Sequence, residues 1–116
     1  MSQQRIFPWT DFLQPADGEP VRSVVTQSAD SVVIAWTVKP GQRITPHVHP
    51  HGTDTWTIVA GEGSYIADTT GSTQQVKAGD VAIARPGEVH GVHNGGTVPL
   101  VFISVVAPVE AGYHVA

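Results

Sequence analysis

The chain has 116 residues, the size of a single domain, and a formal net charge of −4. Its six Lys and Arg residues are too few for a surface that tracks nucleic-acid phosphates, and the absence of Cys excludes disulfides, thiol nucleophiles and thiolate metal ligands. Apolar runs are too short to span a membrane, and residues 1–12 lack the apolar stretch of a signal peptide. A cytoplasmic protein is therefore expected.

Residues 1–20 are expected to form an extended N-terminal arm, because Pro8, Pro15 and Pro20 interrupt regular structure. Residues 21–116 are expected to form one domain of β-strands, since apolar residues alternate with polar ones and Gly- and Pro-containing turns separate the runs. The predicted strands are residues 21–28, 31–39, 54–60, 64–68, 73–77, 81–84, 89–93 and 98–107. This pattern predicts an all-β protein, either a sandwich or a barrel.

Five of the six histidines lie between positions 47 and 93. His47 and His49 belong to the sequence PHVHPH, and residues i and i+2 of a strand point to the same face. Two imidazoles on one face begin a metal site, to which Asp54 and His90 on other strands can add an oxygen and a nitrogen ligand. One divalent metal ion with open positions for water or substrate is predicted. Such ligands suit iron, manganese, nickel or zinc without selecting one.

The same pattern has a structural interpretation, because a His-x-His pair in a strand is often a surface or packing feature. Pro50 breaks the strand, so His51 is expected in a loop at the mouth of the site rather than among the ligands. His93 is three residues after His90 and should face the other way. His114 lies near the end of the chain and is not expected to take part.

Two longer motifs surround these residues. The first is Gly41-(x5)-His47-x-His49-(x4)-Asp54-(x6)-Gly61, and the second is Gly79-(x6)-Pro86-Gly87-(x2)-His90-(x3)-Asn94. In order and spacing they resemble the two sequence motifs of the cupin superfamily, and they cover residues 41–94. The chain departs from the family pattern at two positions. Asp54 stands where the family usually has Glu, and Arg85-Pro86-Gly87 stands where the family has Pro-x-Gly.

The resemblance implies a small jelly-roll barrel, also called a double-stranded β-helix, with a metal ion inside one mouth. The family's ligands are the three motif imidazoles and the carboxylate, which carry over to His47, His49, Asp54 and His90. Because Asp54 is one methylene shorter than Glu, it must approach the ion closely or leave it to the imidazoles. The turn glycines of the motifs are Gly41, Gly61, Gly79 and Gly87.

Strand alternation predicts the lining of a pocket around the ion. Side chains on the same face as Asp54 and His90 point inward, and the strand at 31–39 adds either the set that contains Trp36 or the opposite set. The expected lining is Trp36, Trp56, Ile58 and Val92, with His51 at the mouth. Such a pocket suits a small, partly apolar molecule. The structural alternative for the aromatic residues is plain core packing.

Three polar side chains are further candidates for a role in the pocket. Tyr65 can supply a hydroxyl, Glu88 can act as a general base near the metal ion, and Arg85 can bind a substrate carboxylate. The alternatives are core packing for Tyr65 and solvated turn positions for Glu88 and Arg85.

A metal ion with open positions can activate dioxygen, polarise a carbonyl or lower the pKa of a bound water. Since imidazoles with a weak carboxylate suit ferrous iron, the favoured hypothesis is a metal-dependent enzyme of the dioxygenase type that acts on a small organic molecule. A non-redox lyase or isomerase is the first alternative, and a small-ligand-binding protein without turnover is the second. The third is an empty barrel without metal.

The N-terminal arm carries apolar side chains, Phe7, Trp9 and Phe12, that need a surface to cover. They can cover a sheet edge of a second copy or fold back onto their own barrel. A homodimer with a small-molecule ligand is expected, and neither nucleic acid nor a membrane is expected as a partner.

Overall fold

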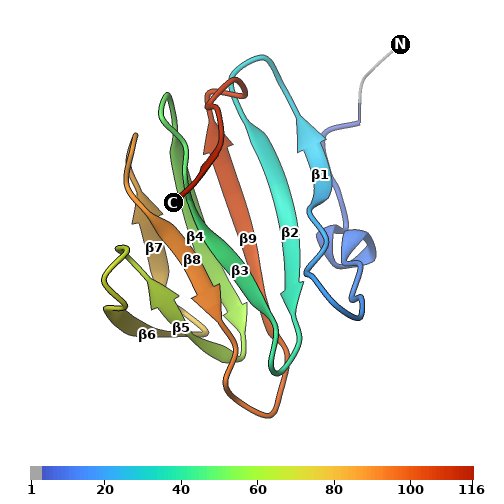
Figure 1. The fold of residues 1–116 in the computed structure, drawn as a ribbon. Coiled ribbons are helices and arrows are strands. Elements are labelled where there is room, and N and C mark those ends of the chain that lie inside the picture. The colour runs from blue at the N-terminus through green and yellow to red at the C-terminus, as the bar shows by residue number, and fades with distance from the viewer. Residues whose placement is uncertain (1–3) are drawn as a thin grey trace.

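The structure, a computed structural model that describes residues 4–116, contains ten β-strands and one short helix in that part of the chain. The 3-10 helix is η1 (Trp9–Phe12), and the strands are β1 (Ser23–Gln27), β2 (Val32–Val38), β3 (Arg43–Val48), β4 (Thr53–Ala60), β5 (Glu62–Ile66), β6 (Thr73–Lys77), β7 (Val81–Ala84), β8 (His90–His93), β9 (Leu100–Ala107) and β10 (His114–Val115). They form two antiparallel five-stranded sheets, with the orders β1-β2-β9-β4-β7 and β10-β3-β8-β5-β6 (Figure 1). The all-β jelly roll expected from the sequence is confirmed.

All eight predicted strands occur in the structure, with ends that differ by at most two residues. His47 lies in a further strand, β3, and His49 directly follows the last residue of that strand. Strand β10 was not predicted, because two residues are too few to show a side-chain period. It forms through backbone pairing, in which His114 and Val115 lie opposite Val48 and His47.

The segment before β1 lies along the edge of the first sheet, where η1 packs against β1 and β2. Phe7 and Phe12 make an edge-to-face contact there, with ring centroids 6.3 Å apart. Residues 1–3 of the expected arm lie outside the described residues. No helix in residues 4–116 is long and apolar enough to cross a membrane.

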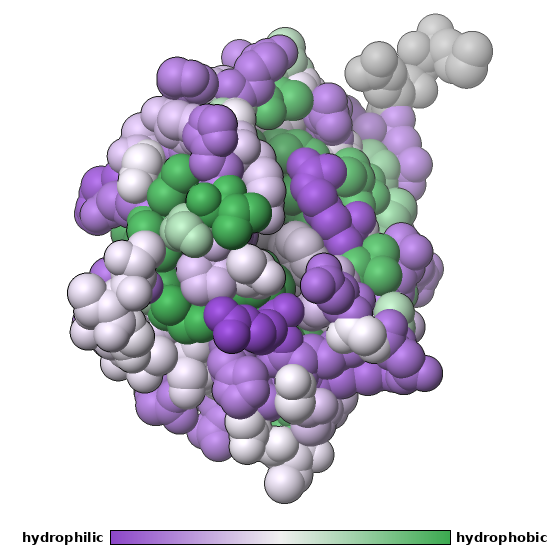
Figure 2. All heavy atoms as spheres, viewed as in Figure 1, coloured by the Kyte–Doolittle hydropathy of each residue, from purple (hydrophilic) through white to green (hydrophobic). Residues whose placement is uncertain are grey.

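The main core fills the space between the sheets with inward-facing side chains of alternating residues. Trp56 of β4 stacks on Phe102 of β9, with ring centroids 4.2 Å apart, and both side chains are buried. A smaller apolar cluster contains Ile34 and Val106, and Trp36 packs against both clusters. On the face seen in Figure 2, hydrophobic and hydrophilic side chains are interleaved rather than separated into two large areas.

Asn94, the last residue of the second motif, has a structural role. Its buried Nδ2 donates hydrogen bonds to the carbonyl oxygens of Val38 (2.8 Å) and Val98 (2.9 Å), and its Oδ1 accepts one from Gly96 N (2.9 Å). Its backbone carbonyl accepts a hydrogen bond from Gly41 N at 2.7 Å. Asn94 therefore connects the end of β8 to the turn that starts the first motif.

Gly61, the last residue of the first motif, has a left-handed backbone with φ of +76°. A Cβ at this position would collide with the carbonyl oxygen of Pro99 and lie 3.0 Å from Leu100 Cα. Gly71 also has a positive φ, of +94°, but a Cβ there would meet no atom within 4 Å. A substitution at Gly61 therefore meets both backbone strain and a steric collision, whereas one at Gly71 meets backbone strain alone.

We predict that Gly61→Ala lowers the free energy of unfolding by more than about 2 kcal/mol, because strain and collision add. Gly71→Ala, the matched control, should cost about 1 kcal/mol through strain alone. Urea denaturation of the two variants measures the difference. Equal losses for both variants would show that the collision with Pro99 is relieved at no cost.

Candidate metal centre

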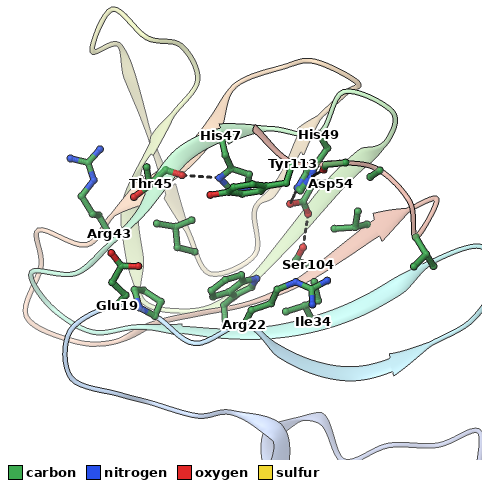
Figure 3. A pocket seen from close by; sticks show the side chains of 17 residues that line it. Glu19, Arg22, Ile34, Arg43, Thr45, His47, His49, Asp54, Ser104 and Tyr113 are labelled. Atoms are coloured by element: carbon green, nitrogen blue, oxygen red, sulfur yellow. Dashed lines mark hydrogen bonds and ion pairs between the residues drawn. The ribbon is translucent and has the colours of Figure 1, made fainter. Parts of the chain in front are cut away.

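Four candidate ligands converge in the space between the two sheets. His47 of β3 and His90 of β8 are paired across neighbouring strands, His49 follows β3, and Asp54 comes from β4 of the other sheet. One ligand atom from each lies within 4.8 Å of all the others. His47, Asp54 and His90 are buried and His49 is half-buried. The strand order therefore brings residues of both motifs to one point. Figure 3 shows the three that come from the first motif, His47, His49 and Asp54.

The three imidazoles are oriented by backbone carbonyl groups. Nδ1 of His47 lies 2.7 Å from the carbonyl oxygen of Thr45, Nδ1 of His49 lies 2.6 Å from that of Gly112, and Nδ1 of His90 lies 3.1 Å from that of Glu88. Because a carbonyl oxygen can only accept, each Nδ1 must carry the proton and donate it. In the neutral ring the lone pair is then on Nε2. This is the tautomer in which metal-binding histidines are usually held.

Asp54 lies at the centre of the cluster. Its Oδ1 accepts a hydrogen bond of 2.5 Å from the hydroxyl of Ser104, and its Oδ2 lies 3.0 Å from His90 Nε2 and 3.4 Å from His49 Nε2. A carboxylate oxygen and an unprotonated nitrogen repel each other at these distances unless a cation lies between them. The cluster is therefore arranged around a shared cation, either a proton or a metal ion.

The surroundings shift the pKa values of the candidate ligands in different directions. Burial lowers the pKa of His47 to about 4, so this imidazole is neutral at neutral pH. The pKa of His49 is raised, chiefly by its contact with Asp54, although burial and the positive charge of Arg22 oppose the rise. Burial acts to raise the pKa of Asp54, but contacts with His49, His90 and Ser104 outweigh it and hold the pKa well below its usual range.

The donor set fits a divalent transition metal. Nitrogen and oxygen ligands bind such ions at about 2.0–2.2 Å, which separates opposite ligand atoms by about 4.2 Å. Donor atoms within 4.8 Å of one another need only a slight contraction to reach this geometry. Four protein ligands also leave positions free in an octahedral ion. Asp54 is short but close enough to be a ligand, because β4 places it directly beside His90.

A cavity of about 540 Å³ opens in front of the cluster. Side chains of β2, β3, β4 and β9 line it, together with the segments before β1 and after β9. The labelled residues of this lining are Glu19, Arg22, Ile34, Arg43, Thr45, His47, His49, Asp54, Ser104 and Tyr113 (Figure 3). The volume lies within the range of small-molecule sites.

The other residues that the sequence proposed for the site lie in three places, namely the cavity wall, the main core and the protein surface. Trp36 lines the cavity. Trp56, Ile58, Val92 and Tyr65 are buried in the main core behind the cluster, where Tyr65 meets the Trp56 ring edge-on at 5.3 Å. Burial, together with the charges of Asp54 and Glu88, raises the pKa of Tyr65 above its usual value, so its hydroxyl keeps its proton.

Arg85, Glu88 and His51 lie on the surface and outside this cavity. Glu88 accepts a hydrogen bond from Arg85 N at 2.7 Å and forms an ion pair with the Arg85 guanidinium at 3.5 Å. The turn before β8 therefore uses both side chains for its own structure. His51 lies in the turn after β3 and donates its backbone N–H to the carbonyl of Ala111.

Sequence reasoning missed several residues at the cavity, among them Ser104, Tyr113 and Arg22. Ser104 faces inward between Phe102 and Val106 on β9. The alternation of this long apolar strand could have predicted that its hydroxyl points inward. Tyr113, whose ring lies 5.1 Å from that of His47, and Arg22 had no such signal. They lie in irregular segments, where side-chain direction follows no period.

Comparison with known proteins identifies the family. Residues 34–106 match the family described as Cupin domain. An oxalate-binding protein of Thermotoga maritima is 33% identical over 67 residues, which make up 58% of this chain and 54% of that protein. The chain thus spans about half the length of the curated relative it matches.

Solved structures agree with the family match. An uncharacterized protein with a double-stranded β-helix domain from Klebsiella pneumoniae has 51% identity and a TM-score of 0.94 over 98% of both chains. An RmlC-like cupin protein from Desulfovibrio desulfuricans has 22% identity and a TM-score of 0.79, over 91% of this chain and 98% of the other. With a family match over more than half of its residues, this chain belongs to the cupin family.

Proposed function

We propose that the protein is a metal-dependent cupin enzyme that acts on a small, partly apolar organic molecule. The observation that carries this proposal is the convergence of three imidazoles, each fixed by a backbone carbonyl, and one buried carboxylate in front of a cavity. A divalent ion bound there polarises a substrate oxygen, lowers the pKa of a bound water or, as ferrous iron, supplies oxygen chemistry.

The residues of the chain contribute orientation and exclusion of water. The carbonyls of Thr45, Gly112 and Glu88 hold the ligand rings, and Ser104 holds Asp54. Apolar side chains such as Trp36 line the cavity together with the ligands, so one end of a substrate can lie in an apolar surrounding while the other faces the ligands. Tyr113 covers the outer side of His47.

Among reaction classes, we propose a dioxygenase, because three neutral imidazoles with one carboxylate suit ferrous iron. A non-redox lyase or isomerase uses the same site with zinc, manganese or nickel. A binding protein without turnover is a second candidate function, and the name of the relative from Thermotoga maritima, an oxalate-binding protein, favours it. Loss of metal-dependent turnover in His49→Ala separates the enzymes from the binding protein.

We predict about one transition-metal ion per chain in untagged protein purified without chelator, measured by elemental analysis. His49→Ala should lose most of this metal, because it removes one oriented nitrogen ligand, and should keep its circular dichroism spectrum. His93→Ala is the control, since His93 is exposed at the end of β8 and makes no contact with the cluster. Less than about 0.2 ion per chain in the unmodified protein would contradict the proposal. Iron would favour the dioxygenase.

We also predict that zinc affinity falls as the pH is lowered from 8 to 6. The contact with Asp54 raises the pKa of His49, so this imidazole keeps a proton to higher pH than usual, and the metal ion must displace it. His47, with a pKa of about 4, is neutral in this range, with no second ring proton to displace, and adds nothing to the dependence. Titration calorimetry in buffers of different ionisation enthalpy measures the released protons. A zinc affinity that does not change with pH would contradict the assignment of His49 as a metal ligand.

We propose that the protein is a homodimer whose subunits meet at the outer face of the first sheet. Four exposed apolar side chains of β4, β7 and β9 lie on this face, namely Val59, Val81, Ile83 and Val105. Ile83 and Val105 lie on either side of Thr55 of β4, and Val81 lies opposite Thr57. Exposed apolar side chains gathered on one face are typical of an interface, and one self-complementary face is sufficient for a twofold dimer.

The double variant Val81→Lys/Ile83→Lys should therefore be a monomer of 12.3 kDa by light scattering, because two pairs of like charges would meet at the twofold axis. Val98→Lys is the matched control, since Val98 is 54% exposed in the loop before β9 and away from this face. The control should keep twice the monomer mass. A monomeric unmodified protein would refute the dimer.

A further inference from the structure

The cations of this protein are distributed unevenly between the surface and the cavity. Of six Lys and Arg residues, three lie within 4 Å of an acidic side chain, in the pairs Lys39–Asp17, Lys77–Asp80 and Arg85–Glu88. Two others, Arg22 and Arg43, line the cavity in front of the metal cluster. Neither has an acidic partner within 4 Å among residues 4–116. The two guanidinium groups that line the cavity are therefore not tied up in ion pairs with the described residues.

Arg22 is the better placed of the two. It directly precedes β1, and its side chain reaches across the cavity beside Ile34, on the side opposite His47 (Figure 3). Arg43 points away from the cluster in the same view. Arg22 and the candidate ligands His47, His49 and Asp54 line the same cavity.

The balance of charge in the cavity favours an anion. A divalent ion held by neutral imidazoles and the single carboxylate of Asp54 leaves positive charge at the cluster. Arg22 and Arg43 add to it, and Glu19 is the acidic side chain on the rim. This excess occurs in a chain with a net charge of −4, so it belongs to the cavity and not to the protein as a whole.

The rest of the cavity is apolar and large. Ile34, Trp36 and Val106 line it next to Arg22, and its volume of about 540 Å³ far exceeds that of oxalate. A ligand that fills this space needs an apolar part beside its charged group. A guanidinium presents a planar fork of N–H donors that matches a carboxylate, which makes a carboxylate the best-fitting anion.

We propose that the cavity binds a small organic carboxylate larger than oxalate, whose anionic group is held by Arg22. Its apolar part lies on Trp36, Ile34 and Val106, and its other end faces the metal cluster. The inference rests on the proposed function for this last element and for the charge that the ion adds, whereas Arg22 and the apolar wall act without a metal ion. Arg22 is thus a specificity-determining residue for the carboxylate class.

The probes are 3-phenylpropanoate and its neutral amide, 3-phenylpropanamide, which differ in charge and hardly in shape. Trp36 in the cavity wall reports binding through tryptophan fluorescence, and calorimetry gives the affinity. We expect the acid to bind more tightly than the amide. Arg22→Gln should weaken binding of the acid at least about tenfold and leave the amide unchanged, because it removes a charge-assisted pair. Arg85→Gln, which lies outside the cavity, should have no effect on either.

Glu19→Gln gives the reciprocal test, since loss of the rim acid should strengthen binding of the acid by about twofold to threefold. Arg22→Lys keeps the charge without the planar fork and should lie between Arg22→Gln and the unmodified protein. Thermal melting of each variant shows that it is folded. Because Arg22 is exposed and has no ion-pair partner in residues 4–116, none of these changes should lower the melting temperature.

Three results would overturn the inference: no saturable binding of the acid, equal affinity of acid and amide, or an Arg22→Gln variant that binds the acid like Arg85→Gln. Tighter binding of oxalate than of 3-phenylpropanoate would overturn the proposed ligand size. All titrations are run on metal-loaded and chelator-treated protein. Failure to load metal would contradict the proposed function alone, while a preference for the acid that depends on Arg22 in chelator-treated protein would still support the inference.

Discussion

Three backbone carbonyl groups determine what the histidine cluster can do. Each accepts the Nδ1 proton of one imidazole, at distances between 2.6 and 3.1 Å, and thereby leaves the Nε2 lone pair directed inward. A histidine side chain alone does not choose between its two tautomers, so the backbone makes this choice. The site is therefore built before any metal ion arrives, and a metal ion needs to displace only the proton shared with Asp54.

The same constraint ties the site to distant parts of the chain. The carbonyl that orients His49 belongs to Gly112, 63 residues later, in the segment that leads into β10. Strand β10 pairs with β3 opposite His47, and the carbonyl of His49 itself accepts a hydrogen bond from Gly87 N in the second motif. The C-terminal segment is thus part of the candidate metal centre, although it contributes no candidate ligand. Its pairing with β3 fixes the ring of His49, which is the most exposed of the three imidazoles.

Much of this architecture could be read from the sequence because it follows a period. Alternation in strands predicted eight strands, the shared face of His47 and His49, and the inward direction of Trp56 and Ile58. Alternation predicted the face of the sheet to which a side chain points, but not how deeply that side chain is buried. It could therefore not distinguish residues of the cavity wall from residues of the core behind it. Trp36 faces the cavity, whereas Trp56 is closed off by stacking on Phe102.

Residues in turns and irregular segments could not be predicted in this way. Arg85 and Glu88 stand next to His90 in the sequence, but the turn that contains them closes through their own hydrogen bond and ion pair, which direct both away from the cluster. Arg22 and Tyr113 are far from the motifs and reach the cavity only because β1 and β10 are edge strands. Their places depend on tertiary structure that no local pattern reports.

The periodic strands of the protein carry the chemistry of the candidate site, whereas the irregular segments carry its specificity. The family match covers residues 34–106, a range that contains all four candidate ligands. Glu19, Arg22 and Tyr113 lie outside that range, yet they form the rim of the cavity. Two cupins with the same ligands can therefore bind different molecules, because side chains such as those of Glu19, Arg22 and Tyr113 can change without altering the ligand set. For this chain, the inference that Arg22 selects a carboxylate therefore concerns a segment outside the family match.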